Sequence, residues 1–328
     1  MRRALIYMSA FVVSFMLMYS WYYYKNLRWL SSGYVANADT LKHTIMAPQP
    51  YQPSIEKNII YSAGLISAMN KAKLEFTIGA KSIFDTIINE QYYSTYKGMY
   101  SPGALDKVSE ETARKFPKHP PLSIQGIKDG EPMIFAYTFR NIELPSAFLE
   151  NIKGIKFGNK TIRAICYNGL GEAGKTKFYF NPKTKQYALV IPIDNNEELF
   201  WYHSDTLQDI ADAWKNLNSF CIQENMHVLS QGQEVVMPAL DLFLEKTYKE
   251  DEMKQYFTLS DYVSKLTDDR IKLKTSAGGH TNGPKDIAAN TQYIFGPSSF
   301  FCLKRKNSTF PYLGIILHNP EFLVETGR

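Results

Sequence analysis

The stretch that decides the fold lies near the carboxyl end of the chain, where residues 310–320 read FPYLGIILHNP and residues 322–324 read FLV. Both runs are apolar, and the first is rich in β-branched and aromatic side chains, which favours buried strands. The polar triplet His318-Asn319-Pro320 between them is typical of a turn. We therefore expect two adjacent buried strands that are joined by a tight turn.

Further segments upstream complete an ordered series with this stretch. They read NIIYS at 58–62, GAK at 79–81, YALVIP at 187–192 and VVMPALDLFLEKTY at 235–248. In content and order the series resembles the signature segments of the serpin family, over residues 57–328. The residues that carry the C-terminal signature are Pro311, His318, Asn319 and Pro320.

The resemblance implies an α+β fold with a large mixed or antiparallel sheet, several packed helices and an exposed reactive loop. Strands and helices that mix without a regular βαβα rhythm also predict α+β. Serpins are not enzymes: a protease cuts the loop, which inserts into the sheet as a new strand and traps the protease. The resemblance thus implies no catalytic residue and no cofactor. It implies another protein as partner, with a protease as one candidate.

The hinge of the reactive loop departs from the family pattern. Gly283, Ala288 and Ala289 are retained, but Pro284 and Asp286 stand where the family has small residues. Proline cannot donate a ladder hydrogen bond, and an unpaired carboxylate is unfavourable in a buried position. We expect a non-inhibitory protein that acts through protein binding. The alternative is an active serpin-type inhibitor of serine or cysteine proteases.

Two positions compete for the reactive bond. Counting forward from Gly283 places the bond near Pro297 and Ser298, whereas counting back from Pro311 places it near Phe300 and Phe301. An exposed loop over 292–306 is the simpler interpretation of this stretch.

The N-terminal segment predicts a membrane anchor. Residues 4–24 carry no charge and would span about 31 Å as a helix, close to the thickness of a bilayer core. We expect a signal-anchor over 1–28, a linker or stalk over 29–56, and a serpin-like domain over 57–328 that lies outside the cytosol or in a lumen. A cleaved signal peptide, and hence secretion, is the alternative.

Sequons at Asn159 and Asn307 make both residues candidates for glycosylation in that compartment.

Composition excludes several function classes. A net charge of +5 on 328 residues, without a long basic block, argues against nucleic acid. The cysteines Cys166, Cys221 and Cys302 form no CxxC pair, and no cluster has metal-ligand spacing. The six histidines are scattered and pair with no nucleophile motif. An unrelated α+β ectodomain stays open as a further alternative.

One motif favours a different function. Residues 169–176 read GLGEAGKT and match the P-loop pattern, which would make the chain a nucleotide-binding protein. The aromatic stretch that follows, 177–182, ends in proline and cannot form the helix that a P-loop requires. We expect a Gly-rich hairpin turn instead. Elsewhere, prolines over 101–132 predict irregular structure, and 207–217 predicts a helix capped by Ser204.

Overall fold

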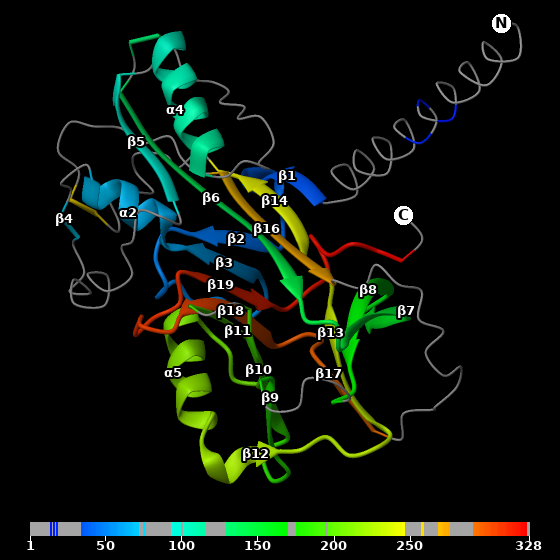
Figure 1. Cartoon of the computed structure of the whole chain (residues 1–328). Coiled ribbons are helices and arrows are strands. Elements are labelled where there is room, and N and C mark those ends of the chain that lie inside the picture. Colours follow the sequence, from blue (N-terminus) through cyan, green and yellow to red (C-terminus); the bar gives the residue numbers. More distant parts are fainter. Residues whose placement is uncertain are drawn as a thin grey trace, which may run out of the picture.

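The computed structural model describes most of the chain from residue 34 to residue 326 (Figure 1). The described residues are 34–71, 75–76, 93–99, 101–115, 129–130, 132–169, 175–193, 196–246, 257–258, 268–275 and 291–326, with Ser14, Met16 and Met18. The expected membrane segment, 4–24, lies outside them apart from those three residues, which are helical and exposed. No helix within the described part of the chain is long and apolar enough to cross a membrane.

An eight-stranded sheet forms the lower half of the molecule in Figure 1, in the order β12-β9-β10-β11-β18-β19-β3-β2. Its strands are β12 (Met226–His227), β9 (Lys177–Asn181), β10 (Gln186–Pro192), β11 (Glu197–His203), β18 (Ser299–Arg305), β19 (Leu313–Leu317), β3 (Asn58–Ser62) and β2 (Thr44–Ala47). Only β2 and β3 pair in parallel. The strands β18 and β19 lie in the middle, so the C-terminal part of the chain completes the sheet.

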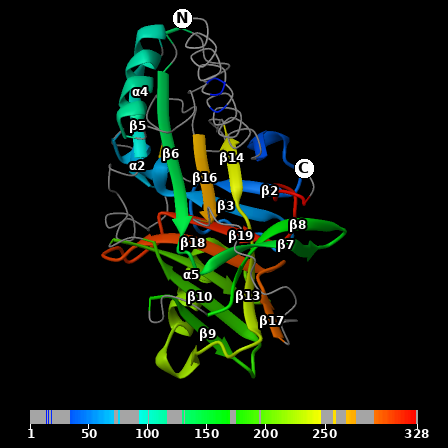
Figure 2. The ribbon, with the colours of Figure 1, turned by 45° about the vertical axis from the view of Figure 1, so that its right-hand side comes forward.

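A five-stranded sheet stands above it, in the order β1-β14-β16-β6-β5 (Figure 2). Its strands are β1 (Tyr34–Asn37), β14 (Asp241–Glu245), β16 (Asp268–Thr275), β6 (Pro132–Leu144) and β5 (Tyr93–Met99). Two of its pairs, β1 with β14 and β16 with β6, are parallel. The helices α2 (Ala63–Lys71) and α4 (Pro102–Lys115) lie against β5.

A four-stranded sheet packs beside the large one, in the order β17-β13-β8-β7. Its strands are β17 (Thr291–Ile294), β13 (Gln233–Pro238), β8 (Lys160–Tyr167) and β7 (Phe148–Phe157). A small sheet pairs β4 (Glu75–Phe76) with β15 (Phe257–Thr258), and two 3-10 turns, η1 (Ala38–Thr40) and η3 (Gln223–Asn225), complete the described elements. One continuous apolar core joins the large and four-stranded sheets. The mixed α+β architecture that we expected is confirmed.

Helix α5 (Ile210–Phe220) covers one face of the large sheet because its apolar residues recur every three or four positions. Its buried residues are Ile210, Ala213, Trp214, Leu217 and Phe220. The expected helix is confirmed, but the cap is Asp209, whose carboxylate accepts from the Asp212 N–H at 2.8 Å. Ser204 lies six residues before the helix and bonds Gln186 instead.

Three expectations about local structure are wrong. Residues 102–115 form α4 rather than irregular structure, because Pro102 is the first helical residue, where its missing N–H breaks no hydrogen bond. Residues 322–324 are buried but form no strand: the Val324 carbonyl accepts from the Arg163 N–H of β8. Residues 34–56 are no free linker, because β1 and β2 belong to the two larger sheets.

The close packing of α5 on β19 at Gly314 yields a prediction. A Cβ atom at Gly314 would lie 3.0 Å from Ile210 Cγ2 and 3.3 Å from Phe300 Cε2, and both neighbours are fully buried. We expect Gly314→Ala to lower the free energy of unfolding by about 1–3 kcal/mol through overpacking, measured by urea denaturation. The control is Gly103→Ala, where no atom lies within 4 Å of the added carbon. Equal stability of the two variants would contradict this account of the interface.

Candidate functional site

The candidate site surrounds the connection between β16 and β17. Strand β16 ends at Thr275 in the five-stranded sheet, and β17 begins at Thr291 in the four-stranded sheet. The chain therefore passes from one sheet to another over residues 276–290. The expected hinge residues all fall in this stretch, outside the described residues: Gly283, Pro284, Asp286, Ala288 and Ala289.

Strand β17, which receives this connection, is firmly held. Its backbone pairs in parallel with β13, and the Phe295 N–H donates to the Val236 carbonyl at 2.8 Å. The Tyr187 hydroxyl donates to the Ile294 carbonyl. The ring of Tyr293 lies 4.8 Å from that of Phe178, with further aromatic rings around it. This aromatic packing fixes the place where the connection ends.

The two candidate reactive bonds lie beyond β17, in a tight turn and in a buried strand. Phe300 and Phe301 are fully buried within β18, so a protease cannot reach the bond between them and that alternative is wrong. Pro297 is exposed, but the Ser298 N–H donates to the Leu317 carbonyl at 2.7 Å, and Ser298 adopts a φ of 62°. The expected loop over 292–306 is likewise wrong, because β17 and β18 occupy most of that range.

The C-terminal signature forms a hydrogen-bond network around Asn58, the first residue of β3. The Asn58 Oδ1 accepts from the backbone N–H groups of His318 at 2.7 Å and Asn319 at 2.9 Å. The Asn58 Nδ2 donates to the Asn319 Oδ1 at 2.8 Å. Pro311 is buried just before β19, which begins at Leu313, and Pro320 precedes the turn that follows the strand. The signature residues thus hold the turn after β19 to β3, which is a structural role rather than a catalytic one.

Glu321 extends this network to the N-terminal side of the domain. Its carboxylate accepts from the backbone N–H groups of Lys42 at 2.8 Å and His43 at 2.9 Å. It also accepts from the Thr44 hydroxyl at 2.7 Å. Burial lowers the pKa of the His318 imidazole. Charge-assisted bonds of this kind are the stronger ones, so they fasten the C-terminal turn to β2.

Buried polar contacts join the five-stranded sheet to the large one. The guanidinium of Arg140 in β6 pairs with the carboxylate of Glu197 in β11, whose side chain is fully buried. The Tyr312 hydroxyl lies 3.3 Å from the other carboxylate oxygen of Glu197. The hydroxyls of Ser62 and Thr138 lie 3.1 Å apart and link β3 to β6. Strand β6, the parallel neighbour of β16, is therefore fixed to the large sheet at two points.

The P-loop lookalike has the wrong surroundings for a nucleotide site. It lies between β8, which ends at Tyr167, and β9, which begins at Lys177. A P-loop requires a helix at that second position to direct backbone N–H groups at a phosphate. The expected hairpin turn is wrong as well, because β8 and β9 belong to different sheets.

The thiols lack the character of catalytic nucleophiles. Burial raises the pKa of Cys166 to about 11 and that of Cys221 to about 12, and it raises the pKa of the fully buried Cys302 as well. All three are therefore protonated at neutral pH, and a thiol is a poor nucleophile. Within the described ranges no group of His, Cys, Asp and Glu could hold a metal ion. Asn159 and Asn307 are exposed, and their glycosylation stays a prediction.

The network around Asn58 yields a second prediction. Asn58→Ala leaves the N–H groups of His318 and Asn319 without their acceptor, and each unpaired buried donor is unfavourable by about 1–3 kcal/mol. We expect a large fall in the free energy of unfolding, measured by urea denaturation. The neighbouring exposed residue provides the control, Lys57→Ala, which should leave stability nearly unchanged. A small effect of Asn58→Ala would mean that water replaces the amide.

No protein-family model matches the sequence, and no curated protein matches it. The solved structures to which the chain is similar include three serpins. Mouse protein-Z dependent protease inhibitor has a TM-score of 0.47 and 11% identity, over 80% of this chain and 91% of its own. Native protease nexin-1 with heparin has a TM-score of 0.43 and 10% identity, over 79% of this chain and 92% of its own. SRPN18 from Anopheles gambiae has a TM-score of 0.40 and 9% identity, over 66% of this chain and 65% of its own. All three belong to the family whose signature segments the sequence resembles.

Proposed function

We propose that this chain is a membrane-tethered serpin-like protein that binds another protein and does not trap proteases. The observation that carries the proposal is the pair Pro284 and Asp286 in the connection between β16 and β17. In this proposal the connection over 276–290 is the binding element, and its sequence prevents it from becoming a strand.

The strand pattern of the five-stranded sheet supports this reasoning. The pairs β14–β16 and β6–β5 are antiparallel, whereas β16 and β6 pair in parallel from Asp268 and Tyr137 to Thr275 and Leu144. A segment that turns back after β16 runs antiparallel to β16. It could therefore insert as a strand between β16 and β6, antiparallel to both. There it would have a hydrogen-bonding neighbour on each side.

Pro284 and Asp286 are unsuited to that place. Proline has no N–H to donate to a neighbouring strand, and it is largely confined to edge strands. The carboxylate of Asp286 would lose its hydration if it faced the core, at a cost of several kcal/mol. Either residue alone slows insertion of the segment into the sheet, and the two together slow it further.

The contacts that hold β6 add a second obstacle. Room for a new strand requires β6 and β16 to separate along their whole pairing. The fully buried Glu197 carboxylate pairs with the partly exposed Arg140 and so ties β6 to the large sheet, and leaving a buried carboxylate without its partner is unfavourable. An active inhibitor is the alternative function, and it is favoured by the retained Gly283, Ala288 and Ala289.

The tether rests on residues 4–24, which are uncharged and are bounded by Arg3 and Lys25. The helical state of Ser14, Met16 and Met18 is compatible with a spanning helix. We propose a single pass with the domain outside the cytosol or in a lumen. In a fractionation of cells that express the full chain, the protein should stay in the membrane pellet after alkaline carbonate extraction. Release into the supernatant, or secretion without residues 1–24, would contradict the tether.

The functional proposal predicts how the chain responds to proteases. On incubation with a trypsin-like protease, we expect cleavage after Lys285, the only Lys or Arg in 276–290, without an SDS-stable complex and without a rise in Tm. The double variant Pro284→Thr with Asp286→Ala should gain a rise in Tm after cleavage, because its segment can insert. Asn282→Ala is the matched control, since it lies in the same segment and leaves Lys285 in place, and it should behave as the unaltered chain. An SDS-stable complex with the unaltered chain would overturn the proposal in favour of the inhibitor.

A further inference from the structure

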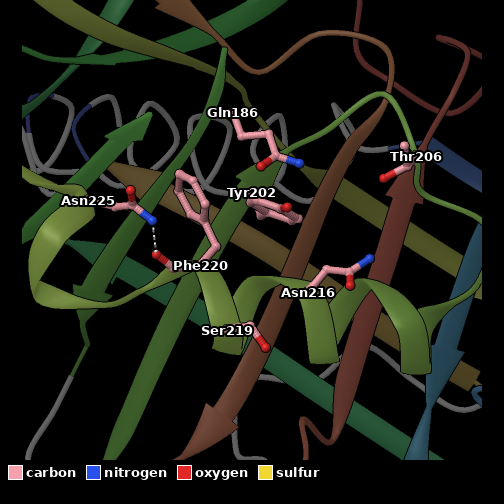
Figure 3. A pocket seen from close by; sticks show the side chains of 7 residues that line it. All are labelled: Gln186, Tyr202, Thr206, Asn216, Ser219, Phe220 and Asn225. Atoms are coloured by element: carbon pink, nitrogen blue, oxygen red, sulfur yellow. Dashed lines mark hydrogen bonds between the residues drawn. The ribbon is translucent and has the colours of Figure 1, made fainter. Parts of the chain in front are cut away.

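An open pocket lies where α5 meets the ends of β10 and β11 (Figure 3). Its volume is about 310 Å³. Seven residues line it: Gln186, Tyr202, Thr206, Asn216, Ser219, Phe220 and Asn225. They come from β10, β11, the connection to α5, α5 itself and η3.

The lining is polar but uncharged. It combines three carboxamides, three hydroxyls and two aromatic rings, one of which carries a hydroxyl, without an acidic or basic side chain. The Tyr202 phenol is neutral at physiological pH, since burial raises its pKa. Such a surface offers a ligand both donors and acceptors, because every carboxamide carries an oxygen and an NH₂ group. It offers no counter-ion to a charged ligand.

Several of these polar groups are already held in place. The Gln186 Nε2 donates to the Ser204 Oγ at 3.0 Å, and its Oε1 accepts from the Thr184 hydroxyl at 3.1 Å. The Asn225 Nδ2 donates to the Phe220 carbonyl at 2.9 Å, the dashed line in Figure 3. Each NH₂ group has a second hydrogen, so each amide is oriented and can still donate to a ligand. Groups that are ordered beforehand lose less entropy on binding.

We propose that this pocket binds an uncharged, hydroxyl-rich ligand, namely a sugar unit. Each sugar hydroxyl both donates and accepts, which matches the carboxamides and hydroxyls of the lining. A charged ligand would lose hydration without an ion partner, and an apolar ligand would leave polar groups of the lining unpaired. The volume lies at the lower end of the roughly 300–1,000 Å³ of small-molecule pockets. The proposal does not depend on the fate of the 276–290 connection.

The test uses the full chain and two probes of the same chemistry, free N,N′-diacetylchitobiose and the same disaccharide linked to a short peptide. Saturation-transfer NMR detects contact, and calorimetry gives the Kd, which we expect to be about 1 mM for so open a pocket. Stronger binding of the peptide-linked probe would identify a glycoprotein glycan as the source, and equal binding would identify a free sugar. Both results support the site.

Variants locate the binding in the pocket. Asn216→Ala and Gln186→Ala should each raise the Kd about two- to tenfold, the effect of one lost hydrogen bond. Asn218→Ala is the matched control: Asn218 is an exposed asparagine of the same helix that does not line the pocket, and its loss should leave the Kd unchanged. Thermal unfolding of Asn216→Ala verifies that the fold is intact.

Three results would overturn the site. The first is absence of saturation transfer to both probes from the folded chain. The second is a Kd that neither Asn216→Ala nor Gln186→Ala changes, or that Asn218→Ala changes equally. The third is equal or tighter binding of glucuronic acid, a charged sugar that the uncharged lining should reject.

Discussion

The burial of β18 and β19 in the middle of the large sheet is the constraint on which the other features depend. These strands separate β11 from β3, and their side chains Phe301, Leu303 and Ile315 have no exposed surface. Because strands from the two ends of the chain meet here, the sheet cannot close before the C-terminal residues arrive. The same arrangement fixes where the connection after β16 must end, since β17 leads directly into β18.

The N-terminal part of the domain supplies one edge strand to each of the two larger sheets. Strand β1 pairs with β14 at one edge, and β2 pairs with β3 at the other. Between them Asp39 forms an ion pair with Lys246 at 3.0 Å, and the Pro50 carbonyl then accepts from the Ala211 N–H at the start of α5. A pull on the proposed tether would therefore reach both sheets and α5 rather than a free stalk.

The sequence was most informative where burial alone decides the structure. The apolar run before His318 predicts a buried strand, and the apolar spacing from Leu207 to Leu217 predicts the helix α5; both were correct. The sequence was misleading where contacts with residues far away in the chain decide the local structure. Val324 reads as a strand residue, but its carbonyl binds β8, a neighbour that no local pattern reveals. Counting back from Pro311 placed Phe300 in an exposed loop, because the sequence does not show where β17 ends and β18 begins.

The candidate site was only partly predictable for the same reason. The signature residues His318 and Asn319 were recognised from the sequence, but their common partner Asn58 becomes visible only when β3 and β19 lie side by side. The pairing of Arg140 with Glu197 joins two sheets, and no sequence spacing encodes it. The polar pocket beside α5 likewise combines residues of separate elements. Its side chains individually read as ordinary surface residues.

Hydrogen–deuterium exchange resolved by residue tests the central claim most directly. If β18 and β19 are the centre of the large sheet, their amides exchange only through global unfolding, with the same free energy as the amides of β10 and β11. Protection of β10 and β11 combined with fast exchange in β18 and β19 would contradict the account. Such a result would mean that the C-terminal strands lie at the surface and that the sheet closes without them.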